Sequence, residues 1–472
     1  MDALELARWQ FGVTTVYHFL FVPLTIGLAF LVAGMQTAWH VSGDPRWLRL
    51  TKLFGKLFLI NFAMGVVTGI VQEFQFGMNW SAYSRFVGDV FGAPLAIEAL
   101  LAFFMESTFI GLWLFGWDRL PRRIHLACIW AAAIGTGLSA YFILAANSWM
   151  QNPVGFRINE AAGRAELTDF GAVLTNPVTL VTVPHVLAGC FLVAGAFVVA
   201  VALWHLSRRP DPDTDPAWRS ALRLGGVTAI IASAVLAVSG DLQAKVMADT
   251  QPMKLAAAEA LFETEAPASF SLFTVGTPDG TEEVFSLRVP GVLSWLATGD
   301  ASGEVRGINE IQVSYAEMFG PGSYAPYLPA TYWSFRLMMG LGALTTLIVL
   351  WAWWAQRGGR TPRSRWLLPA GLILPVLPVA ANSFGWILRE MGRQPWVVFG
   401  EMLTADGVSP NVTAGDVALS FTSFTLIYGV LAVIELKLLL TFARQGLPDP
   451  TPPADPEEER DEAGERLLDF AY

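Results

Sequence analysis

The sequence predicts an all-α integral membrane protein with nine transmembrane helices. Of its 472 residues, 54% are hydrophobic and only 15% are charged, whereas about a quarter of the residues in soluble domains carry charge. A bilayer core about 30 Å thick requires about 20 apolar residues per helix. Open strands leave backbone groups unpaired in lipid, so the apolar stretches are expected to be helices. The nine stretches are 11–38, 55–76, 93–115, 124–146, 180–204, 221–242, 331–354, 367–388 and 418–442.

The distribution of Lys and Arg predicts how these helices are oriented, because short cytoplasmic loops are enriched in both residues. One set of connections is rich in basic residues, namely Arg46, Arg49, Lys52, Arg119, Arg122, Arg123, Arg208, Arg209, Arg219, Arg357, Arg360, Arg363 and Arg365. The alternate connections carry fewer, namely Arg85, Arg157, Arg164, Arg389 and Arg393. With nine spans, this difference puts the N-terminus outside, the C-terminus in the cytoplasm and one long loop on the extracytoplasmic side.

Four regions follow from this pattern. Residues 1–242 hold transmembrane helices 1–6, residues 243–330 form the extracytoplasmic loop, and residues 331–445 hold helices 7–9. Residues 446–472 form an acidic cytoplasmic tail, which is expected to be disordered because it is too polar to bury a core. The tail carries much of the acid behind the net charge of -10, so nucleic acid is not an expected partner.

The five histidines fall into two groups. His40, His125 and His205 lie at cytoplasmic helix ends beside Trp or Arg, where an interfacial histidine needs no special role. His18 and His185 lie inside apolar stretches. Ionisable or metal-binding residues inside a membrane are costly, which makes these two candidates for function.

A methionine can complete a metal site with one of these histidines. A His–Met pair supplies both axial ligands of a six-coordinate haem suited to electron transfer. His185 and Met338 form one candidate pair, although Met339 is an equal candidate by position and most buried methionines are packing residues.

Two carboxylates lie in the third span. Glu98 and Glu106 are eight residues apart, which in a regular α-helix places them about 80° apart around the axis and about 12 Å apart along it. We expect a proton relay, with hydrogen-bonded glue between helices as the alternative. Four nearby polar residues could extend the relay: Ser107, Thr108, Ser139 and Asn147.

A short segment after the eighth span is rich in charge. Arg389 to Trp396 contains two guanidinium groups, one carboxylate and one indole. Arginine binds carboxylates, including haem propionates, in bidentate fashion, and Glu390 could bind iron or receive protons. The alternative is an ordinary interfacial loop.

Six motifs together resemble subunit I of the cytochrome bd-type ubiquinol or menaquinol oxidases. They are YHFLFVP (17–23), EFQFG with NW (73–80), FGAPLAIE (91–98), FGWD (115–118), WMQNP (149–153) and GRQPW (392–396). The resemblance runs from residue 1 to about residue 445, with the motifs in the family's order.

The resemblance implies three haems and assigns residues to them. His185 and Met338 match the axial ligands of a low-spin haem b, with Arg336 near it. His18 matches the axial ligand of a high-spin haem, and Glu390 matches a carboxylate at the other one. The implied cofactors are low-spin haem b, high-spin haem b and haem d, and which high-spin haem belongs to His18 stays open. Arg393 and Trp386 are implied near Glu390, and Glu98 and Glu106 match acids linked to the di-haem site and its proton path.

The extracytoplasmic loop resembles the short version of the family's quinol loop. Within the motif KLAAAE (254–259), the resemblance implicates Lys254 and Glu259 in quinol oxidation. A base there is chemically reasonable, because quinol loses two protons with its two electrons. Ala260 stands where many relatives have glycine, which could alter a turn.

By this resemblance, the chain is a subunit of a terminal oxidase in the bacterial cytoplasmic membrane. It would oxidise quinol outside and reduce dioxygen to water, generating a proton-motive force without pumping. The expected partners are a second large membrane subunit (subunit II), without which the chain is inactive, and possibly a small single-helix subunit. One alternative is a cyanide-insensitive quinol oxidase with b-type haems only. A proton-coupled secondary transporter is a remote alternative, because nine spans give no inverted repeat.

Overall fold

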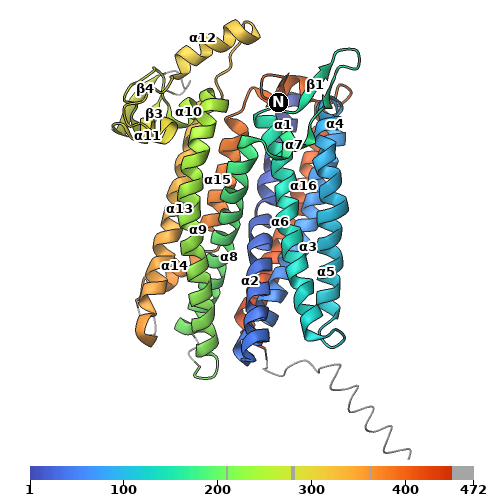
Figure 1. Ribbon diagram of the computed structural model, residues 1–472, viewed down its shortest axis with the longest axis vertical. Helices are drawn as coiled ribbons and strands as arrows, with labels where there is room; N and C mark the ends of the chain where they lie inside the picture. The colour runs from blue at the N-terminus through green and yellow to red at the C-terminus, as the bar shows by residue number, and fades with distance from the viewer. Residues whose placement is uncertain (209–210, 278–281, 361–363, 449–472) are drawn as a thin grey trace, which may run out of the picture.

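A bundle of nine apolar helical spans dominates the structure, as the sequence predicts. The computed structural model describes residues 1–208, 211–277, 282–360 and 364–448. Within these residues, nine helical segments are long and apolar enough to cross a membrane (Figure 1). The nine segments are Ala3–Ser42, Pro45–Met78, Ser81–Phe115, Arg122–Gln151, Pro177–Arg208, Asp215–Thr250, Leu328–Ala355, Leu367–Met391 and Ala414–Gln445.

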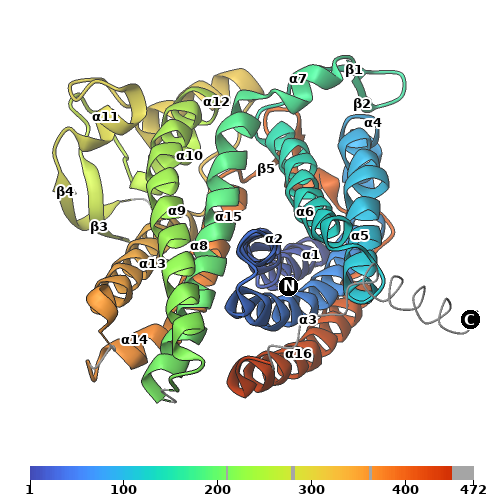
Figure 2. The same cartoon turned by 60° about the horizontal axis from the view of Figure 1, so that its bottom comes forward.

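Six spans are single helices: α3 (Pro45–Met78), α6 (Arg122–Gln151), α8 (Pro177–Arg208), α9 (Asp215–Thr250), α13 (Leu328–Ala355) and α16 (Ala414–Gln445). The most apolar stretch of α8 is 83% buried, and that of α16 only 11%. Helix α8 packs against α2, α6 and α9, whereas α16 lies at the outside of the bundle beside α1 and α3 (Figure 2). The core is therefore built around α8.

The first and eighth spans are broken, where the sequence predicts continuous helices. The first comprises α1 (Ala3–His18) and α2 (Val22–Ser42), with Pro23 in the first turn of α2. The eighth comprises α14 (Leu367–Ile373) and α15 (Leu377–Met391), separated by a segment that includes Pro375. Proline lacks the N–H that a continuous helix uses, which explains both breaks. The first break places His18 at the end of a helix.

The third span contains an irregular turn next to the predicted relay. It starts at Ser81, earlier than expected, and comprises α4 (Ser81–Ile97), a π-helical turn (Glu98–Phe103) and α5 (Phe104–Phe115). Pro94 lies one turn before the π-helical turn. The angle of about 80° expected between Glu98 and Glu106 assumed a regular α-helix. It therefore does not apply to this segment.

The predicted extracytoplasmic loop is largely folded. Helix α9 continues to Thr250, and further helices and a hairpin follow: α10 (Pro252–Glu259), β3 (Phe270–Gly276), β4 (Glu283–Val289), α11 (Val292–Thr298) and α12 (Ile308–Phe319). An apolar cluster that includes Met253, Ile311 and Trp396 holds these elements together. They lie at the end of the bundle that also holds the N-terminus (Figure 1).

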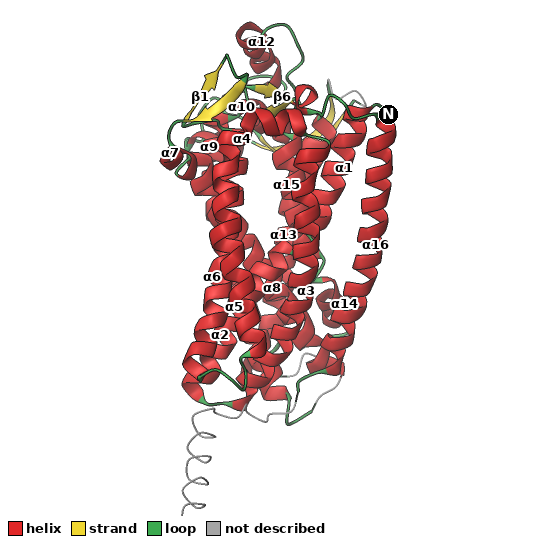
Figure 3. Cartoon of the chain, turned by 90° about the vertical axis from the view of Figure 1, so that its right-hand side faces the viewer, coloured by secondary structure: helices red, strands yellow, loops and turns green. Residues whose placement is uncertain are grey.

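Short elements complete the fold at the same end. They are β1 (Phe156–Asn159), β2 (Arg164–Leu167), α7 (Phe170–Leu174), β5 (Trp396–Val398), β6 (Met402–Leu403) and a 3-10 turn (Thr404–Gly407). Each two-stranded sheet is antiparallel, and the strands lie outside the long helices (Figure 3). The strands are the one departure from the all-α prediction.

The connections rich in Arg and Lys lie at the opposite end of the bundle (Figure 1). A 3-10 turn (Arg357–Gly359) belongs to one of them. Arg209, Arg363 and the predicted tail beyond residue 448 lie outside the described residues. The two cysteines, Cys128 and Cys190, are free and buried.

Candidate functional site

His18 is held by a hydroxyl and a glycine of helix α3. Its Nδ1 lies 2.8 Å from Thr68 Oγ1, and the same hydroxyl lies 3.0 Å from the carbonyl oxygen of Met64. A hydroxyl has one proton, which the carbonyl takes, so Oγ1 accepts from Nδ1–H. This assigns the imidazole tautomer and leaves the Nε2 lone pair for a ligand bond. A Cβ on Gly69 would lie 3.2 Å from His18 Cε1, so glycine permits this close approach.

His185 repeats this arrangement on helix α9. Its Nδ1 lies 3.0 Å from Ser239 Oγ, which donates to the carbonyl of Val235 at 2.7 Å. The next residue is Gly240, where a Cβ would lie 3.6 Å from His185 Cε1. The Nε2 lone pair of His185 is therefore also directed away from the orienting hydroxyl. Metal-binding histidines characteristically have such a partner on the second ring nitrogen.

Two of the other histidines have purely structural contacts. His125 accepts from Gln36 at Nδ1 and donates from Nε2 to the carbonyl of Trp113, each at 2.8 Å. His205 donates from Nε2 to the carbonyl of Ala443 and stacks on Trp218. Both are buried inside helix packing, not exposed at an interface, which refines the interfacial role expected from sequence.

Met338 packs over a third glycine. A Cβ on Gly385 of α15 would lie only 2.9 Å from Met338 Sδ. The next residue, Trp386, faces α1 and stacks on Phe19 with ring centroids 4.9 Å apart. Adjacent residues of an α-helix point about 100° apart, so Met338 and Phe19 contact different faces of α15. The sulfur that makes the close approach to Gly385 belongs to Met338.

Helix α15 also links Met338 to the depth of His185. On α8, a Cβ on Gly189, one turn beyond His185, would lie 2.7 Å from Asn382 Oδ1. Asn382 in turn lies about one turn before Gly385 on α15. His185 and Met338 thus come to a similar depth in the bundle.

Glu390 lies at the end of α15 in a buried polar cluster. Its Oε1 accepts from Asn147 Nδ2 at 2.9 Å and from Gln151 Nε2 at 3.4 Å, and its Oε2 forms an ion pair with Arg393. Arg389 donates to Asn147 and also to Thr182 Oγ1 and Ser148 Oγ, both at 3.0 Å. Asn147, expected to extend the relay from Glu98, belongs instead to this cluster.

Lys254 reaches the Glu390 cluster from the loop end. Its Nζ donates to Gln151 Oε1, and the neighbouring Gln251 donates to the Gln151 carbonyl at 2.7 Å. Burial, with Arg389 and Arg393 close by, lowers the pKa of Lys254 well below its usual range. The amine is therefore two hydrogen bonds away from Glu390, through the side-chain amide of Gln151.

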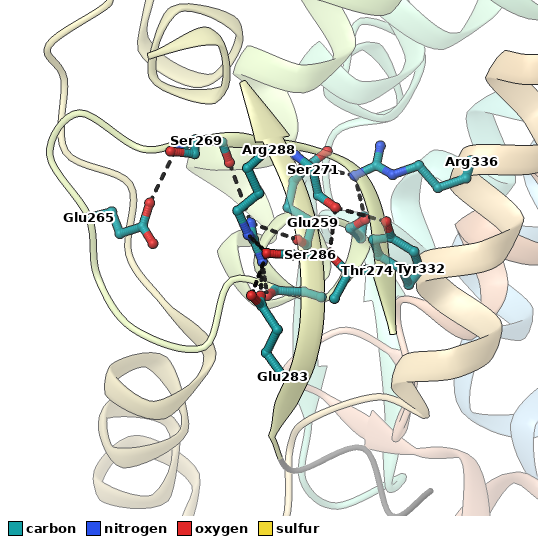
Figure 4. A network of polar contacts seen from close by, with 12 residues as sticks. Glu259, Glu265, Ser269, Ser271, Thr274, Glu283, Ser286, Arg288, Tyr332 and Arg336 are labelled. Atoms are coloured by element: carbon teal, nitrogen blue, oxygen red, sulfur yellow. Dashed lines mark hydrogen bonds and ion pairs between the residues drawn. The ribbon is translucent and has the colours of Figure 1, made fainter. Parts of the chain in front are cut away.

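Glu259 lies in a different network at the other end of α10 (Figure 4). Its Oε2 lies 2.8 Å from Arg336 Nη2 and accepts from the Ser271 backbone N–H at 2.9 Å. Tyr332 and Ser271 join through their hydroxyls at 2.8 Å. Burial raises the pKa of Glu259 above its usual range, against the opposing effect of Arg336. The sequence groups Lys254 with Glu259, but the structure puts their side chains into separate networks.

The two carboxylates of the third span pack against α6. Glu98 accepts from Ser139 Oγ at 2.5 Å, and Glu106 is buried, with its backbone against Gly135. Ser107 and Thr108 are exposed on the surface of the chain. The contact with Ser139 agrees with the expected relay, whereas Ser107 and Thr108 point away from it.

The residues present fit haem groups better than a bare metal ion. Within the described residues, no three His, Cys, Asp or Glu side chains gather in a metal-binding group. The candidate ligands lie instead on separate helices, which suits haem irons that need only one or two protein ligands each. Arg336 Nε and Nη1 and Arg393 Nη1 are buried and have no hydrogen-bond partner in the part of the chain that the structure describes. Guanidinium groups of this kind are suited to haem propionates.

Sequence reasoning missed the residues that orient the two histidines. Thr68 with Gly69 and Ser239 with Gly240 are hydroxyl–glycine pairs inside apolar spans, a signal that could have been found. Gln151 was seen only as part of a motif. Its role as a link between Lys254 and Glu390 depends on three segments that are distant in sequence.

Comparisons with known proteins agree with this arrangement. The family model for cytochrome bd terminal oxidase subunit I matches residues 6–447. Cytochrome bd ubiquinol oxidase subunit 1 of Bacillus subtilis (strain 168) is 46% identical over 447 residues, covering 94% of each chain. Cytochrome bd-II ubiquinol oxidase subunit 1 of Escherichia coli (strain K12) is 36% identical over 94% of this chain and 97% of its own.

A solved structure supports the same assignment. The structure of bd oxidase from Geobacillus thermodenitrificans superposes with a TM-score of 0.84 at 30% identity, covering 94% of this chain and 99% of that one. The helices that present His18, His185, Met338 and Glu390 lie within the residues matched by the family model. The chain therefore belongs to the family of cytochrome bd terminal oxidase subunit I.

Proposed function

We propose that the chain is the haem-bearing subunit of a quinol:oxygen oxidoreductase that reduces dioxygen to water. The observation that carries this proposal is the paired arrangement of His18 and His185. Each has its Nδ1–H bonded to a hydroxyl and its ring over the glycine that follows. Two oriented imidazoles inside one membrane bundle are expected of a protein that binds more than one haem.

His185 and Met338 are the proposed axial ligands of a low-spin haem b. The similar depth of the two side chains and the close packing of Met338 on Gly385 support this pair. Arg336, two residues before Met338, has buried guanidinium nitrogens without partners that suit a propionate. A haem held in this way supplies one-electron redox chemistry with no open position for substrate.

His18 and Glu390 are the proposed protein groups at the two high-spin haems, a high-spin haem b and a haem d. Trp386 lies about one turn before Glu390 on α15, and its ring stacks on Phe19, the residue that follows His18. Both carboxylate oxygens of Glu390 accept hydrogen bonds, Oε1 from Asn147 and Gln151 and Oε2 from Arg393, so Oε2 keeps a second lone pair for iron. Which of the two haems belongs to each residue is left to the haem arrangement in the assembled oxidase.

Glu259 is the proposed base for quinol oxidation, in the loop that also contributes Lys254. Its buried Oε1 has no hydrogen-bond partner among the described residues, and its pKa, which burial raises above the usual range, suits a group that takes up a proton. Lys254, on the same helix, is linked to Glu390 through the side chain of Gln151. Together, the two residues couple quinol oxidation to the haem-binding end of α15.

The proposed orientation in the membrane explains how the reaction would generate a proton-motive force. The Arg- and Lys-rich connections lie at one end and the quinol loop with the N-terminus at the other, which supports an outer quinol site by the positive-inside rule. Protons released from quinol would leave outside, while Glu98 and Glu106 would carry protons for water formation from the cytoplasm. A proton-motive force follows without pumping.

The proposed setting is the bacterial cytoplasmic membrane, with a second large membrane subunit and possibly a small single-helix subunit. The subunit number in the names of the relatives supports such an assembly. A far-red absorption band in the purified oxidase is expected for haem d. Its absence would favour the variant with b-type haems only.

His185→Ala tests the proposal directly. The variant should insert normally but lose the low-spin haem from the reduced-minus-oxidised spectrum of the oxidase. An unchanged low-spin spectrum would reject His185 as a ligand.

A further inference from the structure

A buried carboxyl on α16 has no role in the sites described above. Of the 32 residues of this helix, three are buried: Val417, Tyr428 and Glu435. Glu435 is 7% exposed, and its Oε1 has no hydrogen-bond partner among the described residues. Side chains that merely join helices make hydrogen bonds to them. Glu435 therefore needs another explanation.

The polar groups next to Glu435 lead toward His18. Tyr428 lies seven residues earlier on the same helix, about 10 Å along its axis. Its carbonyl accepts from Tyr17 Oη at 2.6 Å, and its own hydroxyl donates to the Thr68 carbonyl at 3.3 Å. Tyr17 is close enough to Glu435 for the two groups to interact electrostatically. Thr68 is the residue whose hydroxyl orients His18.

The opposite direction leads to the basic end of the bundle. Phe442 lies seven residues after Glu435, again about 10 Å along the helix, and the Lys56 ammonium lies 3.5 Å from its ring centroid. Arg49 Nε donates to the Pro448 carbonyl at 2.8 Å, just beyond the end of α16. Glu435 is thus midway between the basic connections and the His18 site. Tyr17 of α1 and Tyr428 of α16 lie on its His18 side, and Lys56 of α3 lies on its basic side.

We propose that Glu435 is a proton carrier on a second polar line, which leads from the basic end along α16 to the His18 site. An unpaired carboxylate is costly in an apolar bundle, so the group is expected to hold a proton between transfers. Each cycle releases one proton toward the His18 side and takes one up from the basic side, leaving Glu435 unchanged. Reduction of one dioxygen to two waters consumes four protons with four electrons from two quinols, and Glu435 would deliver a share of these protons beside the line through Glu98 and Glu106.

This line is separate from the one through Glu98 and Glu106, which lies on α4, α5 and α6. Helix α16 packs instead on α1 and α3 (Figure 2). The gaps of about 10 Å are too long for direct transfer, since hydrogen bonds span about 2.8 Å. Two or three internal waters would bridge each gap.

The test uses the complete oxidase, with three substitutions of Glu435. Glu435→Gln keeps the shape and polarity but removes the transferable proton, Glu435→Asp keeps the acid, and Glu435→Leu removes both. Thr441→Val is the matched control, because Thr441 is exposed on α16 and its hydroxyl donates to the Lys437 carbonyl of the same helix. Turnover in H₂O and D₂O and redox-induced infrared difference spectra in the region of carboxylic acid C=O stretching are measured, together with haem content.

Glu435→Gln should lower turnover by about tenfold or more, because a positioned acid or base typically contributes about 10²–10⁴-fold and the line through Glu98 and Glu106 is left in place. It should also raise the solvent isotope effect and remove one redox-linked carboxylic acid band, with haem content unchanged. Glu435→Asp should keep a shifted band and most of the turnover, whereas Thr441→Val should resemble the unmodified protein.

The proposal would be overturned if Glu435→Gln kept the turnover, isotope effect and infrared spectrum of the unmodified oxidase. An equal loss of turnover in all three Glu435 variants would also overturn it. If Glu435→Gln does not assemble, Glu435→Asp decides: a shifted carboxylic acid band supports the proposal and an unshifted band overturns it. The inference rests on the proposed role of His18, but the two fail differently. A wrong assignment of His18 appears in the haem spectrum of His18→Ala, and a wrong role for Glu435 appears in the isotope effect and the infrared band.

Discussion

Removal of the Ser239 hydroxyl should weaken the low-spin haem site without changing either proposed ligand. In Ser239→Ala, the Nδ1–H of His185 loses the oxygen that lies 3.0 Å away. A buried polar group that loses its partner costs about 1–3 kcal/mol. At about 1.4 kcal/mol per tenfold, this corresponds to about 5- to 150-fold. The range includes the 10- to 100-fold loss typical of partners that orient metal ligands.

The assay is retention of the low-spin haem in the purified oxidase, followed by reduced-minus-oxidised spectra and redox titration. Ser239→Ala should lose this haem more readily, and its midpoint potential should rise because the imidazole becomes a weaker base. Ser239→Thr should keep both properties. Ser233→Ala is the control on the same helix, since its hydroxyl bonds Thr346 at 2.8 Å and not a histidine. Equal haem retention and midpoint potential in Ser239→Ala and unmodified protein would refute the assigned tautomer.

Three further predictions concern the loop end. Glu259→Gln should slow quinol oxidation, and most strongly at high pH, because the ionised carboxylate is the base. In the unmodified oxidase, activity should fall as the pH drops through the raised pKa of Glu259. A profile of activity against pH checks this prediction. Lys254→Met should slow quinol oxidation and also alter the high-spin haem spectrum, because the link through Gln151 to Glu390 is lost. Ala260→Gly should raise the thermal unfolding temperature, because Ala260 has φ of +48° and a left-handed conformation costs a non-glycine residue about 1 kcal/mol; a thermal melt of the purified oxidase measures it.

Separate results would contradict each of these three. For Glu259→Gln, the decisive result is an activity profile against pH that keeps the acidic limb of the unmodified enzyme. An unaltered high-spin spectrum in Lys254→Met would mean that Gln151 holds Glu390 without the amine. Loss of stability in Ala260→Gly would mean that the methyl group contributes more to packing than its backbone conformation costs.

The number and approximate place of the spans could be predicted from the sequence because apolar length is a local property. The breaks in the first and eighth spans follow prolines that are visible in the sequence, but the π-helical turn at Glu98 does not follow from composition. The angle predicted between Glu98 and Glu106 from a regular α-helix therefore does not hold at the position of the expected proton relay.

The candidate ligands could be predicted because His, Met and Glu are conspicuous in apolar segments. The pairing of each ligand with its partner could not, because the two side chains come from different helices and meet only in the folded bundle. Ser239 meets His185 across 54 positions and Asn147 meets Glu390 across 243. Lys254 and Glu259 show the same limit: five residues apart on one short helix, they face different networks.

The central claim is that His18 and His185 bind different haems. A density map of the assembled oxidase at side-chain resolution tests it most directly. The account predicts that His185 Nε2 and Met338 Sδ bind one iron, while His18 Nε2 binds another and Glu390 lies at a third. A single iron shared by His18 and His185, or Met338 on no iron, would contradict it.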